Sequence, residues 1–195
     1  LTSITISNSV TSIGVSAFES CTSLKSITIP NSVTRIGEHA FRRCTNLVSI
    51  TISNSIISIE AWTFAYCISL ISITIPNSVT SIEVSAFDSS TSLKSIIIPN
   101  SVTGIGKYAF QNCTSLNQIG IITEDKAKFE SVRSLLPNSL KDKAIMVSQE
   151  VIEIRKAALE KFSMTSEACP LFFCAKNAAD KLTDSLPAEV WALIN

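Results

Sequence analysis

The sequence is poor in charged residues and has no long apolar run. Charged residues make up 16% of the 195 residues, and 16 basic side chains balance 16 acidic ones, whereas a soluble domain carries about 25% charged residues. Nucleic-acid-binding and membrane-surface proteins usually show a basic excess, so the balance argues against both classes. No apolar stretch approaches the roughly 18 residues of a membrane-spanning helix.

Histidine is also scarce, and the common catalytic motifs are missing. His39 is the single histidine, so a Ser-His-Asp or Cys-His arrangement would depend on it alone. The chain has no glycine-rich nucleotide loop, no HExxH zinc motif and no GxSxG motif. We therefore predict a protein that is not an enzyme, with no catalytic residue, no cofactor and no metal.

What the chain does contain is a 23-residue repeat. The units begin at Leu1, Leu24, Leu47, Leu70, Leu93 and Leu116, and the last unit fades after Ile122. The second unit reads LKSITIPNSVTRIGEHAFRRCTN: its start alternates like a half-buried strand, and Pro-Asn-Ser is typical of a turn. No unit can bury its apolar residues alone, so we expect stacked coils with a parallel sheet and a column formed by Phe18, Phe41, Phe64, Phe87 and Phe110.

The repeat L-x-S-I-x-I-P-N-S-V-x-x-I-G-x-x-A-F-x-x-C resembles the BspA-type, or treponemal-type, leucine-rich repeat over residues 1–122. The departures are Ser7 and Ser53 for proline, Glu60 and Glu83 for glycine, and Ser90 for cysteine. The resemblance implies a curved, right-handed solenoid that binds proteins, at the bacterial cell surface or as an effector secreted into a host. The predicted fold class is an α/β repeat: a leucine-rich-repeat solenoid with a parallel sheet, followed by a small helical domain.

Four of the six cysteines recur at one position of the repeat: Cys21, Cys44, Cys67 and Cys113. Stacked coils would bring their Cα atoms within disulfide range, but parallel Cβ directions disfavour the bond, and metal sites need converging ligands at short spacing. We expect reduced thiols that pack as small hydrophobic groups. Cys169 and Cys174 match no common metal or redox spacing.

The tail, residues 123–195, changes to helical apolar spacing. Thr123 is predicted to cap a first helix that ends before Pro137, and a longer helix is expected from Ser139 to Phe162. The inward residues of the first helix are expected to be Ala127, Phe129, Val132 and Leu136. We predict that the tail is a helical capping domain that covers the last coil of the solenoid over residues 1–122, because a bare terminal coil exposes apolar side chains and unpaired strand edges.

Two groups of outward residues are candidates for binding a partner. The first is a row of stacked neighbours in which an aliphatic pair lies between two lysines: Lys25, Val48, Ile71 and Lys94. An apolar pair with a charged rim suits a protein interface, although isolated exposed aliphatic residues are common on any surface.

The second candidate lies in the turn around the phenylalanine column and comprises His39, Arg42, Arg43, Trp62 and Tyr66. Trp, Tyr and Arg are the residue types enriched in interface hot spots. The competing interpretation is that Trp62 only covers a thin edge of the most irregular coil.

These patterns favour a protein-protein interaction module of a bacterial surface protein or secreted effector. One alternative is an adaptor, because LPAEVWALI in residues 186–194 resembles the opening of an F-box that would recruit host machinery. A second alternative is a glycan-binding adhesin or an enzyme that uses the Ser/Thr face of the strands. The first coil has no cap, so we expect further residues upstream or self-association through that edge.

Overall fold

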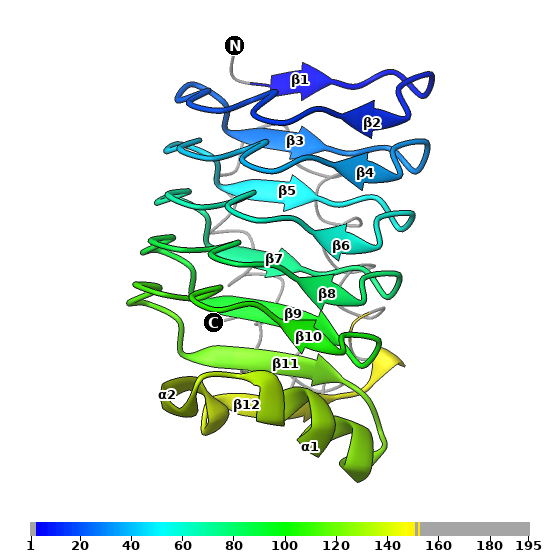
Figure 1. Cartoon of the computed structure of the whole chain (residues 1–195), viewed down its shortest axis with the longest axis vertical. Coiled ribbons are helices and arrows are strands. Elements are labelled where there is room, and N and C mark those ends of the chain that lie inside the picture. The colour runs from blue at the N-terminus through cyan, green and yellow to red at the C-terminus, as the bar shows by residue number, and fades with distance from the viewer. Residues whose placement is uncertain (1–2, 151, 153–195) are drawn as a thin grey trace, which may run out of the picture. The chain divides into compact units, whose positions relative to one another are not determined.

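The computed structural model describes residues 3–150 and residue 152 (Figure 1). The chain divides into two compact units, residues 1–146 and residues 147–195. The first unit contains the stacked coils, two helices and most of the last strand.

Each of the five complete coils contributes two short strands. The first strands are β1 (Ser3–Thr5), β3 (Ser26–Thr28), β5 (Ser49–Thr51), β7 (Ser72–Thr74) and β9 (Ser95–Pro99), and β11 (Gln118–Ile122) begins the sixth coil. The second strands are β2 (Ser12–Ile13), β4 (Arg35–Ile36), β6 (Ser58–Ile59), β8 (Ser81–Ile82) and β10 (Gly104–Ile105). Neighbouring strands pair in parallel with a shift of one repeat, as Ile27 with Ile50. The predicted solenoid with parallel sheets is confirmed.

The sheets are interrupted at the third coil, residues 47–69. The first strands form the ladders β1-β3-β5 and β7-β9-β11-β12 (β12 is Ala144–Val147), and the second strands form β2-β4 and β6-β8-β10. Other coils link here through a threonine hydroxyl, as Thr34 Oγ1 donates to the Thr11 carbonyl at 3.3 Å. The third coil carries Ile57 at this position, and an isoleucine cannot donate such a bond to the second coil.

The phenylalanine column is continuous across this interruption. The rings of Phe18, Phe41, Phe64, Phe87 and Phe110 stack in order with centroid distances of 5.1, 5.6, 5.5 and 5.6 Å. The three central rings are fully buried. The predicted column is confirmed. It joins the second coil to the third, whose second strands, β4 and β6, do not pair with each other.

The cysteine position contributes a hydrogen bond as well as packing. Each side chain donates to a phenylalanine carbonyl of the preceding coil: Cys44 to Phe18 (3.1 Å), Cys67 to Phe41 (3.2 Å), Ser90 to Phe64 (2.8 Å) and Cys113 to Phe87 (3.1 Å). The four thiols of the described coils are free, as expected. The shared donor role explains why serine can replace cysteine at this position.

We expect Ser90→Ala to lower the free energy of unfolding by about 1–2 kcal/mol, because a buried carbonyl loses its hydroxyl donor. The Phe64 carbonyl would keep only a long bond from the Cys67 amide at 3.4 Å. Ser90→Cys restores the residue of the other coils and should stay within about 0.5 kcal/mol of the parent protein. Urea denaturation followed by circular dichroism measures both. Equal losses in the two variants would show that the donor is unimportant.

After the sixth strand the chain forms α1 (Lys126–Leu135), whose N-cap is Asp125. The Asp125 carboxylate accepts from the amides of Ala127 (2.7 Å) and Lys128 (3.3 Å). The prediction of Thr123 as the cap was wrong, since its hydroxyl instead accepts from the Asp125 amide at 3.0 Å.

The inward face of α1 largely follows the prediction. Val132 and Leu136 are buried and Phe129 is half-buried, but Ala127 is exposed because it lies in the first turn, ahead of the packed part of the helix. The helix ends at Leu135, before Pro137, as predicted. Val132 and Leu136 belong to the same hydrophobic core as the coils.

The expected long helix from residue 139 to residue 162 was wrong over its first part. One turn of helix, α2 (Asn138–Lys141), is followed by the strand β12, which extends the sheet beyond β11 (Figure 1). Pairing with the open edge of β11 satisfies backbone groups that a helix would leave at that edge unpaired. The rest of that prediction, and residues 169–195 with Cys169 and Cys174, lie outside the described residues.

Candidate protein-interaction surface

Between the second strand of one coil and the first strand of the next, every coil makes a turn with two left-handed residues. Their φ angles lie between 53° and 64°. The pairs are Ser16 and Ser20, His39 and Arg43, Trp62 and Tyr66, Ser85 and Ser89, and Tyr108 and Asn112. We call these ten residues, with the residue that precedes the second of each pair, the turn surface; the preceding residues are Glu19, Arg42, Ala65, Asp88 and Gln111. Three members of this set, Ala65, Ser85 and Asp88, are buried, and the others are at least partly exposed.

The backbone of the turn surface is regular where the sheets are not. Amides of one coil donate to carbonyls of the next at both left-handed positions: His39 to Ala61 (3.1 Å), Trp62 to Val84 (3.1 Å) and Tyr66 to Asp88 (2.8 Å). These bonds pass through the third coil without a break. A uniform backbone that carries different side chains in each coil is well suited to recognition, because the scaffold fixes where each side chain projects.

The structure brings together all five residues of the second predicted group, which we call the aromatic–arginine cluster. The His39 and Trp62 rings stack with centroids 6.2 Å apart. The guanidinium carbon of Arg42 lies 5.7 Å from the Trp62 ring centroid and 5.8 Å from that of Tyr66. The guanidinium carbon of Arg43 lies 5.7 Å from the Tyr66 centroid. The three arginine-to-ring distances fall within the range of cation–π attraction.

The two arginines of the cluster differ in their charge partners. Arg42 forms a salt bridge to Glu19 at 3.1 Å, with both side chains about a quarter exposed. The pKa of Glu19 is lowered, chiefly by a hydrogen bond from Ser16 and further by Arg42. Arg43 is exposed and forms no salt bridge within the described part of the chain. The accessible positive charge of the cluster is therefore that of Arg43.

The left-handed backbone was not foreseen from the sequence. Outside glycine this conformation is uncommon, and asparagine tolerates it better than most residues. A signal was present, because serine or asparagine fills five of the ten left-handed positions. Trp62 and Tyr66 gain no backbone advantage there, so their presence is better explained by what their side chains contact.

The first predicted group is also brought together as a row along the coils. The amide of Val48 donates to the Lys25 carbonyl at 2.8 Å, that of Ile71 to the Val48 carbonyl at 3.5 Å, and that of Lys94 to the Ile71 carbonyl at 2.8 Å. The two lysines are exposed and the aliphatic pair is half-buried. The expected arrangement of an aliphatic pair between two lysines is therefore present, although Val48 and Ile71 offer only part of their surface.

The described residues hold no group of three or more His, Cys, Asp or Glu side chains that could bind a metal ion. None of the helices described here is long and apolar enough to cross a membrane. Burial raises the pKa of Cys44 to about 11 and that of Cys113 to about 12, which disfavours the thiolate, the reactive form of cysteine.

Stacked 23-residue coils with inward leucine, isoleucine and phenylalanine columns define a leucine-rich-repeat solenoid. Residues 1–117 match, in six copies, the family described as the BspA type leucine rich repeat region. The chain belongs to this family, as the sequence pattern indicated.

Solved structures of bacterial repeat proteins are similar to the chain. A leucine rich cell surface protein from Faecalibacterium prausnitzii is 40% identical over 67% of this chain and 34% of its own, with a TM-score of 0.64. A leucine rich repeat protein of T. pallidum is 37% identical over 57% of this chain and 52% of its own, with a TM-score of 0.56. A leucine-rich repeat protein from Bacteroides ovatus is 43% identical over 56% of this chain and 28% of its own, with a TM-score of 0.55.

The chain thus spans between about a quarter and about half of the length of these proteins. The search of curated proteins found no match.

Proposed function

We propose that the chain is a protein-interaction module of a bacterial surface protein and that it captures its partner through the aromatic–arginine cluster. The observation that carries the proposal is the stacking of Arg42 and Arg43 on Trp62 and Tyr66. Stacked side chains lose little further freedom on binding, which favours affinity. The family and the surface protein of similar structure support the class of function.

The cluster is a better candidate than the row formed by Lys25, Val48, Ile71 and Lys94. Trp, Tyr and Arg dominate interface hot spots, whereas Leu and Val are under-represented there and Lys is depleted at interfaces. The row remains a second proposed contact region, to be compared directly with the cluster.

Replacing Trp62 and Tyr66 together by serine is expected to abolish partner capture and to lower the free energy of unfolding by less than about 2 kcal/mol. Serine is the residue of the first and fourth coils at both positions, so the backbone is retained, and only half-exposed rings and their cation–π contacts are lost. Quantitative affinity capture with the full chain, followed by mass spectrometry and urea denaturation, measures both effects.

A variant of the row, with Val48→Thr and Ile71→Thr, is the matched control and should keep its captured proteins. If only that control variant lost partner capture, the partner would bind the row and not the cluster. Equal loss of capture and of stability in the Trp62→Ser, Tyr66→Ser variant would show that the cluster is structural.

We also propose that the start of the tail caps the solenoid. The support is that Val132, Leu136 and Leu140 share the core with Leu116 and that β12 pairs with β11. If so, the amides of β11 should exchange hydrogen more slowly than those of the open first strand β1. Rapid exchange in β11 would contradict a capping role.

The adaptor function and self-association remain proposals. The LPAEVWALI segment lies outside the described residues; replacing Leu186 and Glu189 by alanine in the full chain should remove a second set of captured proteins if the segment recruits host machinery. Self-association would use β1, whose outer edge has no partner strand within the described chain. Sedimentation of the full chain over a range of concentrations tests it.

A further inference from the structure

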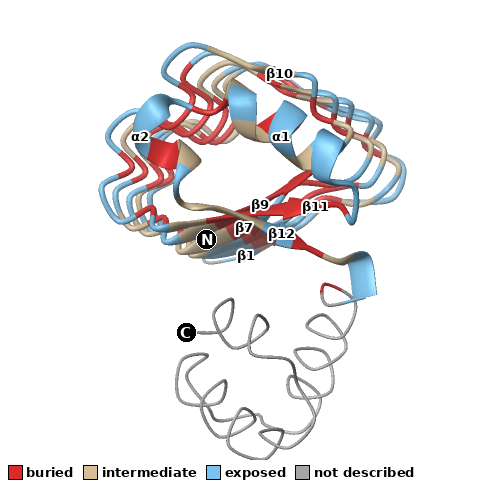
Figure 2. Ribbon diagram, turned by 90° about the horizontal axis from the view of Figure 1, so that it is seen from below, coloured by how far each residue is buried: buried red, intermediate tan, exposed pale blue. Residues whose placement is uncertain are grey.

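A groove of about 640 Å³ opens between the fifth coil, residues 93–115, and the segment that carries α1 and α2. Its floor is apolar and includes Ile105, Phe110, Leu135, Leu136 and Leu140. In the view along the coils, α1 and α2 lie across the end of the stack (Figure 2). The volume is typical of a site that binds a ligand or a short peptide segment.

The polar lining of the groove has a single sign of charge. Lys107 and Lys143 line it, together with the amides Gln111 and Asn112, and no aspartate or glutamate is among the lining residues. Lys143 is held in place because its ammonium group donates to the Leu116 carbonyl. Asp88, the carboxylate in contact with this lining, is buried and already accepts from Asn112 (3.4 Å) and Ser89 (3.0 Å).

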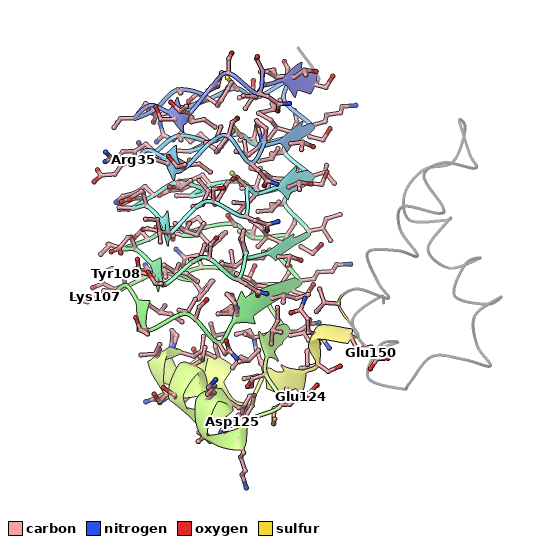
Figure 3. All side chains as sticks on the ribbon, turned by 90° about the vertical axis from the view of Figure 1, so that its right-hand side faces the viewer. Arg35, Lys107, Tyr108, Glu124, Asp125 and Glu150 are labelled. Carbon is pink, nitrogen blue, oxygen red and sulfur yellow. The ribbon has the colours of Figure 1, made fainter. Side chains whose placement is uncertain are left out.

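The groove is continuous with the turn surface. Tyr108, Gln111 and Asn112 line it, and they occupy in the fifth coil the positions that Trp62, Ala65 and Tyr66 hold in the third. Tyr108 is 51% exposed. The Lys107 ammonium lies 4.6 Å from the Tyr108 ring centroid, and both side chains project from the outer edge of the stack (Figure 3).

We propose that this groove binds an acidic segment of the protein partner, with aliphatic or aromatic side chains on the apolar floor and carboxylates at Lys107 and Gln111. The proposal rests on the proposed function, because the segment belongs to the protein that the turn surface captures. Charge complementarity selects the occupant: the lining offers cations and amide donors and no competing acid. A sulfated glycan suits the groove less well, since two lysines and an apolar floor provide few contacts for sulfate groups.

Lys107→Glu with Gln111→Glu tests the groove without disturbing the coil. Glutamate already occupies both positions elsewhere in the repeat, as Glu38 in the second coil and Glu19 in the first. The matched control, Lys126→Glu with Ser131→Glu, makes the same change in net charge at exposed positions of α1 outside the groove.

The probe is a library of random 12-residue peptides displayed on phage and selected against the full chain. Selected peptides should be enriched in Asp and Glu beside apolar residues. Their affinity, measured with synthetic copies, should fall at least tenfold in the Lys107→Glu, Gln111→Glu variant, stay unchanged in the control, and fall as NaCl rises from 50 to 500 mM.

Peptides without acidic enrichment, or equal affinity for the parent and the groove variant, would overturn the proposal. The proposal would also be overturned if heparin displaced the peptides and if heparin binding were itself lost in the groove variant. The groove would then be a glycan site. The Trp62→Ser, Tyr66→Ser variant separates the two proposals: groove-dependent binding that survives this variant supports the groove alone, and cluster-dependent binding insensitive to the groove variant supports the cluster alone.

Discussion

Phe64→Ala is expected to lower the free energy of unfolding by about 3–5 kcal/mol, the usual cost of removing a buried phenylalanine ring. The Phe64 side chain is fully buried. Its ring stacks on Phe41 at 5.6 Å and on Phe87 at 5.5 Å. Alanine would leave a cavity between two rings, and neighbouring coils fixed by their strands cannot close it completely.

Because Phe64 lies in the third coil, we expect Phe64→Ala to change the cooperativity of unfolding as well as the free energy of unfolding. The third coil pairs its first strand only with the second coil and its second strand only with the fourth. The phenylalanine column, the turn backbone and the bonds donated by Cys67 and Ser90 therefore provide the continuous links through this coil. A repeat protein is stabilised by contacts between neighbours, so weakening this link should separate the unfolding of the first two coils from that of the later ones.

Urea denaturation followed by circular dichroism tests both expectations through a lower midpoint and a lower m-value or a second transition. Phe18→Ala is the matched control, because Phe18 is half-buried at the end of the column and stacks on one ring only. It should cost less than half as much and leave a single transition. Similar losses in both variants would contradict a special role for the third coil.

The coil architecture could be predicted because each feature repeats. A single strand such as residues 26–28 is too short to identify by itself, but the same pattern at a fixed spacing fixes strand, turn and inward column together. For the same reason the sequence placed His39 beside Trp62 and Val48 beside Ile71, since residues at one repeat position must stack.

Features that occur once were not accessible in this way. Residues 144–147 could extend a helix or form a strand, and the open edge of β11, a tertiary contact, decides the outcome. The interruption at the third coil, which carries Ile57 where the neighbouring coils carry threonine, also occurs only once in the chain. The groove is formed by the fifth coil together with Leu135 and Leu140 from outside the repeat. The repeat pattern alone therefore could not predict it.

The buried thiols are expected to make the free energy of unfolding depend strongly on pH in the alkaline range. Cys44 and Cys67 have no exposed surface and Cys113 is 7% exposed. Burial raises the pKa of Cys44 to about 11, that of Cys113 to about 12, and that of Cys67 strongly upward. An unfolded cysteine has a pKa near 8.5, so the folded protein holds these three protons in a pH range where the unfolded chain releases them.

The sign of the effect follows from proton counting. Between about pH 8.5 and the raised folded values the folded state binds more protons, so stability falls as pH rises. Each thiol costs up to about 1.4 kcal/mol per pH unit, and three thiols together cost up to about 4 kcal/mol per pH unit. Below about pH 7 all three are protonated in both states, and their contribution no longer depends on pH.

The triple variant Cys44→Ser, Cys67→Ser, Cys113→Ser should lose this dependence, since serine does not ionise and already acts as the donor at Ser90. Urea denaturation at intervals from pH 7 to pH 10.5, with a phosphine reductant, compares the two proteins. Tyrosine and lysine ionise equally in both, so the difference between the two slopes isolates the thiols. Parallel slopes would mean that the solenoid opens at the cysteine column and admits water there, because only a hydrated thiol ionises near its ordinary pKa.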